Sequence, residues 1–263
     1  MTLTKFTPAL AAAVVLSLAG GASAGESAEL SDLAGRIDYG FYVGDARAIA
    51  NAVAALKRMS DSDAAVRYYR AFASFRLAQL DVEHAASHAE DCVKKATVEE
   101  PTEHLTRAGA EARARASVES WLLVAVCAGL AGRSEQGKGL LHDKRLAPAL
   151  ARAREIEPSN PRIALLDAWL VSRRPALADA AVRDDAVAKL EAAAAAFAAW
   201  SPPPDSTEWG EAEALAALAE VRLARGQVRD ARDLIERALL VAPDYRVALE
   251  LKAQLQGSKS ASR

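Results

Sequence analysis

The sequence predicts an all-α fold built from stacked antiparallel helix pairs. Alanine, leucine, glutamate and arginine are strong helix formers that dominate nearly every segment, and no convincing alternating strand pattern is present. Turn-forming residues interrupt the chain, leaving helical patterns of roughly 10 to 20 residues between them. The segment Ala212–Tyr245 carries small residues where two helices of a hairpin would touch. Because one helix pair cannot bury its apolar face alone, such pairs are expected to stack into a continuous core.

The first 24 residues are predicted to be a secretory signal peptide. Lys5 gives a short positive region, Ala9–Leu18 is mostly apolar, and Ala22-Ser23-Ala24 is a small-x-small cleavage site. A membrane anchor is the alternative, but the apolar run is well below the ~20 residues that a spanning helix needs. We therefore expect Sec-type export with cleavage after Ala24, and a mature protein that is periplasmic or secreted.

The mature chain is expected to be a nearly neutral single domain. Removal of residues 1–24 takes away one lysine and no acid, which leaves 32 basic against 35 acidic residues, a net charge of −3. This balance argues against a nucleic-acid partner, because binding to phosphates requires a basic surface. We expect one helical repeat domain over residues 25–257, no membrane insertion, and a disordered tail at 258–263.

The clearest repeat is Ala212–Tyr245, a segment of 34 residues. Its small contact residues, turn glycine and closing proline are Ala219, Ala231, Ala238, Gly226 and Pro243. This unit resembles the tetratricopeptide repeat family. The resemblance implies a right-handed α-solenoid of about five helix pairs that binds proteins and performs no chemistry of its own.

Weaker copies of the same pattern cover most of the mature chain. The units lie at about 29–59, 66–97, 118–158, 161–197 and 212–245, and a capping helix follows at 246–256. The third and fourth units each carry a loop insertion, near 132–145 and 173–183. The residues expected to pack helix against helix in these two units are Trp121, Ala125, Ala153, Pro158, Ala186 and Ala193. This layout is similar to uncharacterised exported bacterial tetratricopeptide repeat proteins.

The resemblance further implies that the first helices of successive repeats line a concave groove. The residues expected to point into it are Arg67, Arg70, Ser74, Leu77, Glu119, Leu122, Val126, Gly129, Glu213, Ala216, Glu220 and Leu223. Such a groove would be basic at one end, apolar in the middle and acidic at the other. It does not match the Lys/Asn carboxylate clamp of chaperone-binding repeats. The alternative is an ordinary solvated face.

The chain has two cysteines, Cys92 and Cys127, for which two interpretations remain open. In an exported protein the pair can be oxidised, and the repeat pattern places the two residues on faces that meet between neighbouring units. A bond would close a loop of ~35 residues and stabilise the fold by roughly 3–4 kcal/mol. The alternative is two buried free thiols.

Motifs for catalysis or cofactor binding are weak in this sequence. Gly132–Gly139 meets the G-x-x-x-x-G-K spacing of a P-loop, but Gly139 stands where the Mg²⁺-binding Ser or Thr belongs, and a helix precedes it instead of a strand. His84 and His88 could share a metal, but no third ligand is specified, so a solvated helix face is the simpler interpretation. No nucleophile motif is present. We expect no catalytic residue, metal or cofactor.

These observations predict a non-catalytic protein–protein interaction scaffold of the bacterial periplasm that binds a peptide or helix in the concave groove. One alternative is a structural or assembly subunit of a cell-envelope complex, docked through its convex face or terminal repeat. Another is an accessory protein whose insertion at 133–145 reaches over a partner's active site. An enzyme or nucleotide-binding protein is the remaining alternative.

Overall fold

The computed structural model describes residues 24–60, 63–96, 107–131, 144–172, 180–201 and 209–261. Within these ranges the chain forms eleven helices and no strand. Their bounds are α1 (Ala24–Val43), α2 (Ala46–Leu56), α3 (Ala64–Leu80), α4 (Ala85–Lys95), α5 (Arg107–Ala131), α6 (Leu146–Ile156), α7 (Pro161–Ser172), α8 (Ala180–Ala199), α9 (Glu211–Ala224), α10 (Val228–Val241) and α11 (Arg246–Ala261).

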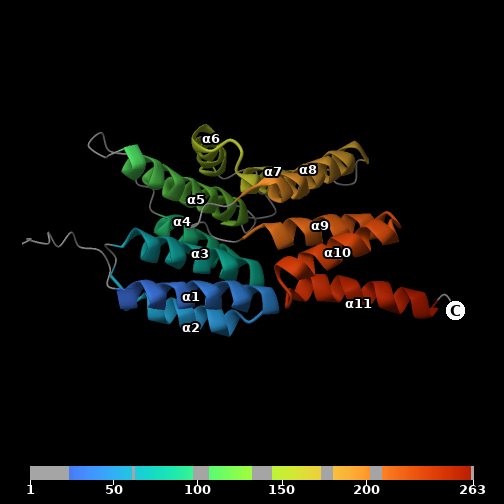
Figure 1. Cartoon of the computed structure of the whole chain (residues 1–263), viewed down its shortest axis with the longest axis horizontal. Helices are drawn as coiled ribbons and strands as arrows, with labels where there is room; N and C mark the ends of the chain where they lie inside the picture. Colours follow the sequence, from blue (N-terminus) through green and yellow to red (C-terminus); the bar gives the residue numbers. More distant parts are fainter. Residues whose placement is uncertain are drawn as a thin grey trace, which may run out of the picture.

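The helices pair in chain order, from α1 with α2 to α9 with α10, and α11 closes the row (Figure 1). Local chemistry sets the turns between partners. The Asp45 carboxylate accepts hydrogen bonds from the backbone N–H groups of Arg47 and Ala48, both at 3.0 Å, and so begins α2. Gly226 has a φ of +73°, the left-handed conformation that lets the chain turn from α9 into α10. The predicted all-α arrangement of stacked helix pairs is confirmed.

Alanines are buried at the positions where the sequence predicts contact between helices. All seven alanines predicted to pack helix against helix are buried, namely Ala125, Ala153, Ala186, Ala193, Ala219, Ala231 and Ala238. A methyl side chain keeps two helix backbones close, so larger side chains at these positions would overpack the core. The remaining packing residues lie nearer the surface, since Trp121 is half-buried and Pro158 and Pro243 are exposed at helix ends.

Several helices differ from their predicted bounds. Helix α1 begins at Ala24, before the predicted start of the first unit at residue 29. Helix α8 begins at Ala180, so residues 180–183 of the insertion predicted at 173–183 are helical. The sequence places the start of the third unit's first helix at residue 118, but α5 begins at Arg107. It places the end of the last helix at residue 256, whereas α11 continues to Ala261. The predicted disordered tail at 258–263 is therefore wrong for residues 258–261, which extend the capping helix. Lys259 and Ala261 favour continued helix, whereas Gly257, Ser258 and Ser260 are weaker helix formers.

Several predictions concern residues outside the described ranges. They are the signal peptide through residue 23, the glycine-rich motif Gly132–Gly139, and most of the two loop insertions. The structure leaves each of them as a prediction.

The row of helix pairs curves until its two ends meet. Helix α11 contacts α1, and α7 contacts α5 (Figure 1). We call this meeting place the seam: α1, α3 and α5 lie on one side, and α7, residues 209–210, α9 and α11 lie on the other. The seam joins segments far apart in the sequence, and it occupies the face where the sequence predicts an open groove.

Candidate functional site

Most of the predicted groove residues do not line an open groove. Buried residues of the set are Ser74, Leu122, Val126, Gly129, Glu213 and Ala216. Half-buried residues are Arg67, Arg70, Leu77, Glu119 and Leu223, and Glu220 is exposed. The expectation of a continuous solvent-lined groove is therefore wrong, because the C-terminal helices return to cover the first helices of the N-terminal pairs.

The basic end of the predicted groove serves the fold itself. Arg70 donates two hydrogen bonds to the Leu56 carbonyl, at 3.1 Å from Nε and 2.6 Å from Nη2, and one to the Met59 carbonyl at 3.0 Å. These bonds satisfy carbonyl groups that the end of α2 leaves without helical partners. Lys95 likewise donates to the Ser74 hydroxyl at 3.0 Å. Neither Arg70 nor Ser74 is positioned as a groove ligand.

A buried arginine of α3 lies at the centre of the seam. The Arg76 side chain is 0% exposed, and its Nη1 donates to Oε1 of Glu213 on α9 at 2.7 Å. The same Nη1 donates to Gln79 at 3.1 Å, and Nη2 donates to Asp38 at 3.4 Å. The guanidinium carbon lies 3.8 Å from the centre of the Phe41 ring. A buried charge needs such pairing, because its desolvation would otherwise cost several kcal/mol.

Glu213, the acid of this pair, also accepts hydrogen bonds at its second carboxylate oxygen. Oε2 of Glu213 accepts the backbone N–H of Gly210 at 3.0 Å and the Tyr42 hydroxyl at 3.3 Å. Burial alone would lower the pKa of Arg76, but the Glu213 carboxylate raises it above its ordinary value. Burial, reinforced by Glu213, raises the pKa values of the Tyr42 and Tyr245 hydroxyls. Arg76 therefore stays charged, and both tyrosines stay neutral at physiological pH.

A second buried arginine crosses the seam in the opposite direction. Arg162 of α7 donates from Nη1 to Oε1 of Glu119 on α5 at 3.1 Å, and from Nε to the Trp209 carbonyl at 3.0 Å. The Trp209 indole N–H donates to Oε2 of the same Glu119 at 3.3 Å. The guanidinium also lies over the Trp200 and Trp209 rings, 4.8 and 5.1 Å from their centres. Each half of the molecule thus supplies one arginine and one acid.

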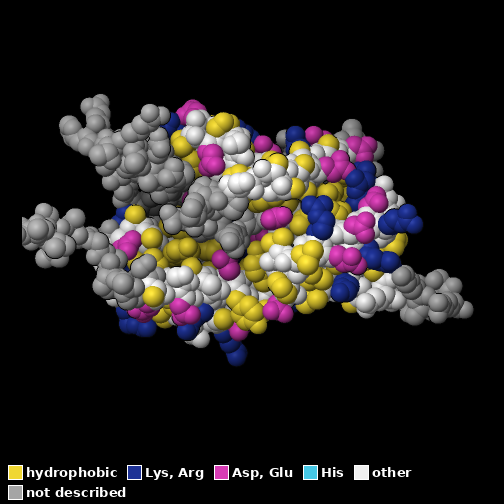
Figure 2. Space-filling model, viewed as in Figure 1, with side chains coloured by type: hydrophobic (Ala, Val, Ile, Leu, Met, Phe, Trp, Pro, Cys, Tyr) yellow, Lys and Arg dark blue, Asp and Glu magenta, His cyan; other side chains and the backbone are white. Residues whose placement is uncertain are grey.

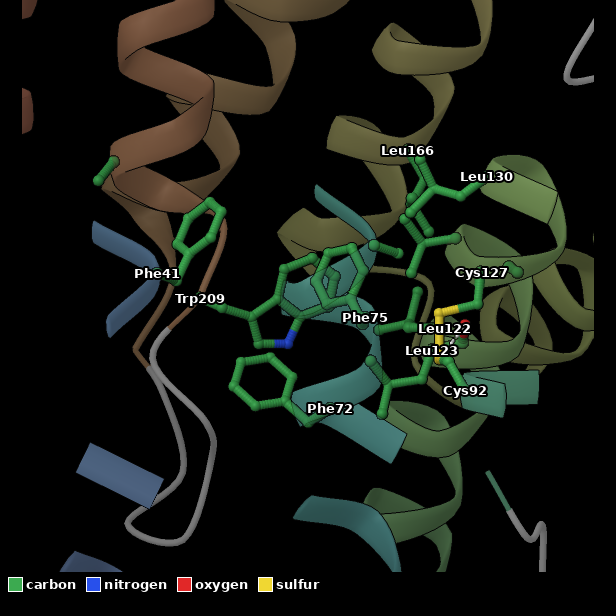
Figure 3. Close-up of a cluster of buried hydrophobic side chains, with 14 of the residues drawn as sticks. Phe41, Phe72, Phe75, Cys92, Leu122, Leu123, Cys127, Leu130, Leu166 and Trp209 are labelled. Atoms are coloured by element: carbon green, nitrogen blue, oxygen red, sulfur yellow. Dashed lines mark hydrogen bonds between the residues drawn. A yellow bond between two sulfur atoms is a disulfide. The ribbon is translucent and has the colours of Figure 1, made fainter. Parts of the chain in front are cut away.

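Trp209 fills the apolar space between the two ion pairs. It is 1% exposed and packs against Phe75 and Phe72 of α3, with ring centres 5.4 and 6.5 Å apart (Figure 3). The next residue, Gly210, has a φ of +106°, and a side chain there would come within 2.7 Å of the Phe197 ring. The glycine therefore lets the chain turn tightly from Trp209 into α9, where Glu213 follows within one helical turn.

A surface hollow of about 460 Å³ opens beside the Arg76 ion pair. Its walls come from the end of α1, the α3–α4 region and the beginning of α11. The aromatic and polar residues that line it are Phe41, Tyr42, Gln79, Glu83, Tyr245 and Arg246. Figure 2 shows hydrophobic side chains gathered near the meeting of α1 and α11. We call this feature the α1–α11 hollow.

The two cysteines are bonded to each other. A disulfide joins Cys92 of α4 to Cys127 of α5 with an S–S distance of 2.11 Å (Figure 3). Of the two interpretations of the cysteine pair, the structure therefore has the bonded one.

The two histidines of the α4 region share one carboxylate. Oδ2 of Asp81 lies 3.1 Å from Nδ1 of His84 and 3.3 Å from Nε2 of His88. Within the described ranges, no three His, Cys, Asp or Glu side chains group as a metal site would require. The same part of the chain contains no helix that is both long and apolar enough to cross a bilayer.

Sequence reasoning missed the two residues that organise the seam, Arg76 and Trp209. A signal for Arg76 is present, because it is the one charge in the otherwise uncharged stretch Ala71–Leu80. Such a charge inside a buried helix implies a specific partner. Trp209 follows the proline run at 202–204 and has the sequence context of a linker. Its burial depends on helices far away in the sequence.

Comparisons with known proteins give one structural likeness. No protein-family model and no curated protein matches this chain. A solved structure of a thermophilic tetratricopeptide repeat protein from Thermus thermophilus is similar, with a TM-score of 0.49 and 20% sequence identity. The match covers 87% of this chain and 97% of that chain. The geometry of the seam and of the hollow therefore carries the functional argument.

Proposed function

We propose that this protein is a non-catalytic interaction scaffold that binds a peptide or helix of a partner protein in the α1–α11 hollow. This proposal rests on one observation: the space open to a partner lies in the α1–α11 hollow and not along the first helices of the repeats. The seam fills the face where the sequence predicts a groove, whereas the hollow remains open beside it and has a volume in the range of ligand sites. The hollow thus replaces the groove as the binding surface.

The chemistry of the hollow favours binding over catalysis. Among the described residues, its lining includes no His, Cys, Ser, Thr, Asp or Lys side chain. Tyr42 and Tyr245 have raised pKa values, caused first by burial and then by Glu213, so they act as neutral hydroxyl groups and not as bases. Alanine, leucine and valine side chains supply apolar contact, while Gln79 and Glu83 supply hydrogen-bond acceptors. This mixture suits the recognition of an amphipathic segment.

The proposed location is the periplasm or the extracellular space. The predicted signal peptide supports it, and so does the Cys92–Cys127 disulfide, because such bonds persist mainly in oxidising compartments. Detection of the mature N-terminus and of the intact disulfide in a periplasmic extract would test this location. A reduced protein with an uncleaved N-terminus, recovered from the cytoplasm, would contradict it.

Site-specific photocrosslinking tests the proposed binding site directly. A benzoylphenylalanine residue at Glu83, on the rim of the hollow, should capture a partner protein in cells that make the full-length chain. The matched control carries the crosslinker at Glu236, an exposed position on α10. Ala86→Trp, which fills the hollow from α4, should abolish the adduct formed from position 83.

The outcome distinguishes binding at a specific site from nonspecific crosslinking to the surface. Capture from position 83 alone, lost in the Ala86→Trp variant, supports a partner in the hollow. Equal capture from positions 83 and 236, or capture that persists when the hollow is filled, contradicts it.

A second candidate function, an assembly subunit of a larger complex, rests on apolar side chains at the C-terminal end. Leu240 is 82% exposed on α10, and Val241 and Leu249 are 45% and 43% exposed on α10 and α11. Exposed apolar groups of this kind mark protein contacts when they gather together. Leu240→Asp should release the protein from a co-purifying assembly, measured by size-exclusion chromatography of cell extracts. An unchanged elution profile would remove this candidate.

A further inference from the structure

We infer that the α1–α11 hollow selects a basic side chain, lysine or arginine, of the partner peptide. This inference rests on the proposed function and adds the chemistry of the group that is recognised. Three features carry it: aromatic rings in the wall, an excess of acidic groups around the hollow, and hydrogen-bond acceptors at its base and rim.

The aromatic wall is a compact cluster of three rings. The ring centres of Phe41 and Tyr42 are 5.3 Å apart, those of Tyr42 and Tyr245 are 5.2 Å apart, and those of Phe41 and Tyr245 are 6.2 Å apart. All three residues line the hollow. The faces of aromatic rings carry negative potential and attract cations. The same cluster already holds one cation from within, because the Arg76 guanidinium lies over the Phe41 and Tyr42 rings at 3.8 and 5.8 Å.

The charges around the hollow do not balance. Glu83 and Arg246 line it, and Arg76, Glu213 and Glu250 each bond to a lining residue. Arg76 is paired with Glu213, and Arg246 is paired with Glu250. Among these described groups Glu83 remains, which gives the hollow an excess of one negative charge. A cationic side chain entering the hollow would reduce this excess, whereas an acidic one would increase it.

Acceptors are available where the cation would arrive. The Gln79 side-chain oxygen accepts only one hydrogen bond among the described contacts, from Arg76, and an amide oxygen has two lone pairs. Glu83 is exposed on the rim and has no ion pair within the described residues. Arg246, the one basic side chain of the described lining, is paired with Glu250 at 2.7 Å. The rim is therefore effectively anionic.

Peptide selection on the purified protein tests this inference. A phage library of random heptapeptides is panned in parallel on the wild type, on Glu83→Lys and on Ala86→Trp. Glu236→Lys, an exposed charge reversal on α10, is the matched control. One enriched peptide is then synthesised with its basic residue intact or replaced by norleucine, and both forms are titrated by calorimetry.

The expected result is enrichment of lysine and arginine in peptides bound by the wild type and by Glu236→Lys, and loss of this enrichment with Glu83→Lys. Replacement by norleucine should weaken binding on the order of tenfold. Peptides that depend on the hollow, shown by their loss with Ala86→Trp, but carry no basic excess would overturn the inference and leave the proposed function intact. Absence of any peptide that depends on the hollow would overturn both.

Discussion

Two interfaces of this molecule hold the helix pairs together with different chemistry. At the joint between the α3–α4 and α5–α6 pairs, buried apolar side chains and the Cys92–Cys127 disulfide make the contact, and a half-exposed ion pair, Glu90 with Arg145, lies beside them. At the seam, distant parts of the chain meet through two buried Arg–Glu pairs and the Trp209 indole. The joint is therefore general in its chemistry, whereas the seam depends on a few particular residues.

This difference follows from how each interface forms. Neighbouring pairs are close in the sequence and share the repeat pattern, so non-directional apolar contact, together with partly exposed polar contacts such as those of Arg70 and Arg145, can hold them in place. The two sides of the seam approach from far apart in the sequence and have no repeat pattern to align them. Paired charges and hydrogen bonds have preferred directions and leave a large penalty when misplaced, so they can define one closed arrangement.

Removal of the indole should produce the largest effect. Trp209→Ala would leave a cavity between Phe72 and Phe75 and remove the hydrogen bond to Glu119, so we expect a loss of about 5 kcal/mol in the free energy of unfolding. Urea denaturation followed by circular dichroism measures it. Trp121→Ala, at a half-buried tryptophan of α5 that contacts neither buried arginine, is the control and should cost clearly less. Equal losses would mean that the seam has no special dependence on Trp209.

Removal of one partner of the buried Arg76–Glu213 ion pair should produce the second-largest loss of stability. Arg76→Met leaves Glu213 buried beside an apolar side chain and should cost about 4 kcal/mol. The double variant Arg76→Met/Glu213→Leu removes both charges and should recover much of that loss, measured by a double-mutant cycle in urea. If the double variant is as unstable as the sum of the single variants, the two side chains act independently and the pair does not organise the seam.

Removal of the disulfide tests the joint by the same measure, the free energy of unfolding. Cys92→Ala/Cys127→Ala opens a loop with a sequence separation of 35 and should cost about 3 kcal/mol. Because the joint and the seam are separate, this loss should add to that of Arg76→Met, measured in the combined variant. A marked departure from additivity would show that the two interfaces are coupled.

Alkaline pH should reveal the smallest effect, at the edge of the seam. Burial raises the pKa values of Tyr42 and Tyr245 above their ordinary value of 10.0, so the folded state binds these protons more tightly than the unfolded state. Their stabilisation is complete below pH 10.0 and is lost as the pH rises above it, by about 1 kcal/mol per tyrosine near pH 11. Thermal melting from about pH 9 to about pH 11 measures the loss.

Phenylalanine substitutions identify the tyrosines responsible. Tyr42→Phe/Tyr245→Phe should reduce the alkaline decline to the part that comes from Tyr69, whose pKa burial also raises, while Tyr39→Phe, at a position that is 58% exposed, should leave it unchanged. An alkaline decline of full size in the double variant would assign the effect to other groups.

The sequence by itself determined the helix pairs. The buried alanines at 125, 153, 186, 193, 219, 231 and 238 are identified by the resemblance to the tetratricopeptide repeat pattern, because contacts inside a repeat are local and recur with a period. The cysteine pair is partly accessible in the same way, since the repeat pattern brings Cys92 and Cys127 to facing sides but cannot decide whether they bond.

Only the tertiary structure decided the seam, and with it the candidate site. The groove prediction assumes that each repeat keeps one face exposed to solvent. In the structure the two ends of the row meet, and residues such as Leu122 and Ala216 are buried. The C-terminal pairs run back alongside the N-terminal ones (Figure 1), and no local sequence pattern records this arrangement. Arg76 and Glu213 are 137 residues apart, so their pairing, and the hollow beside it, exist only once the whole chain has folded.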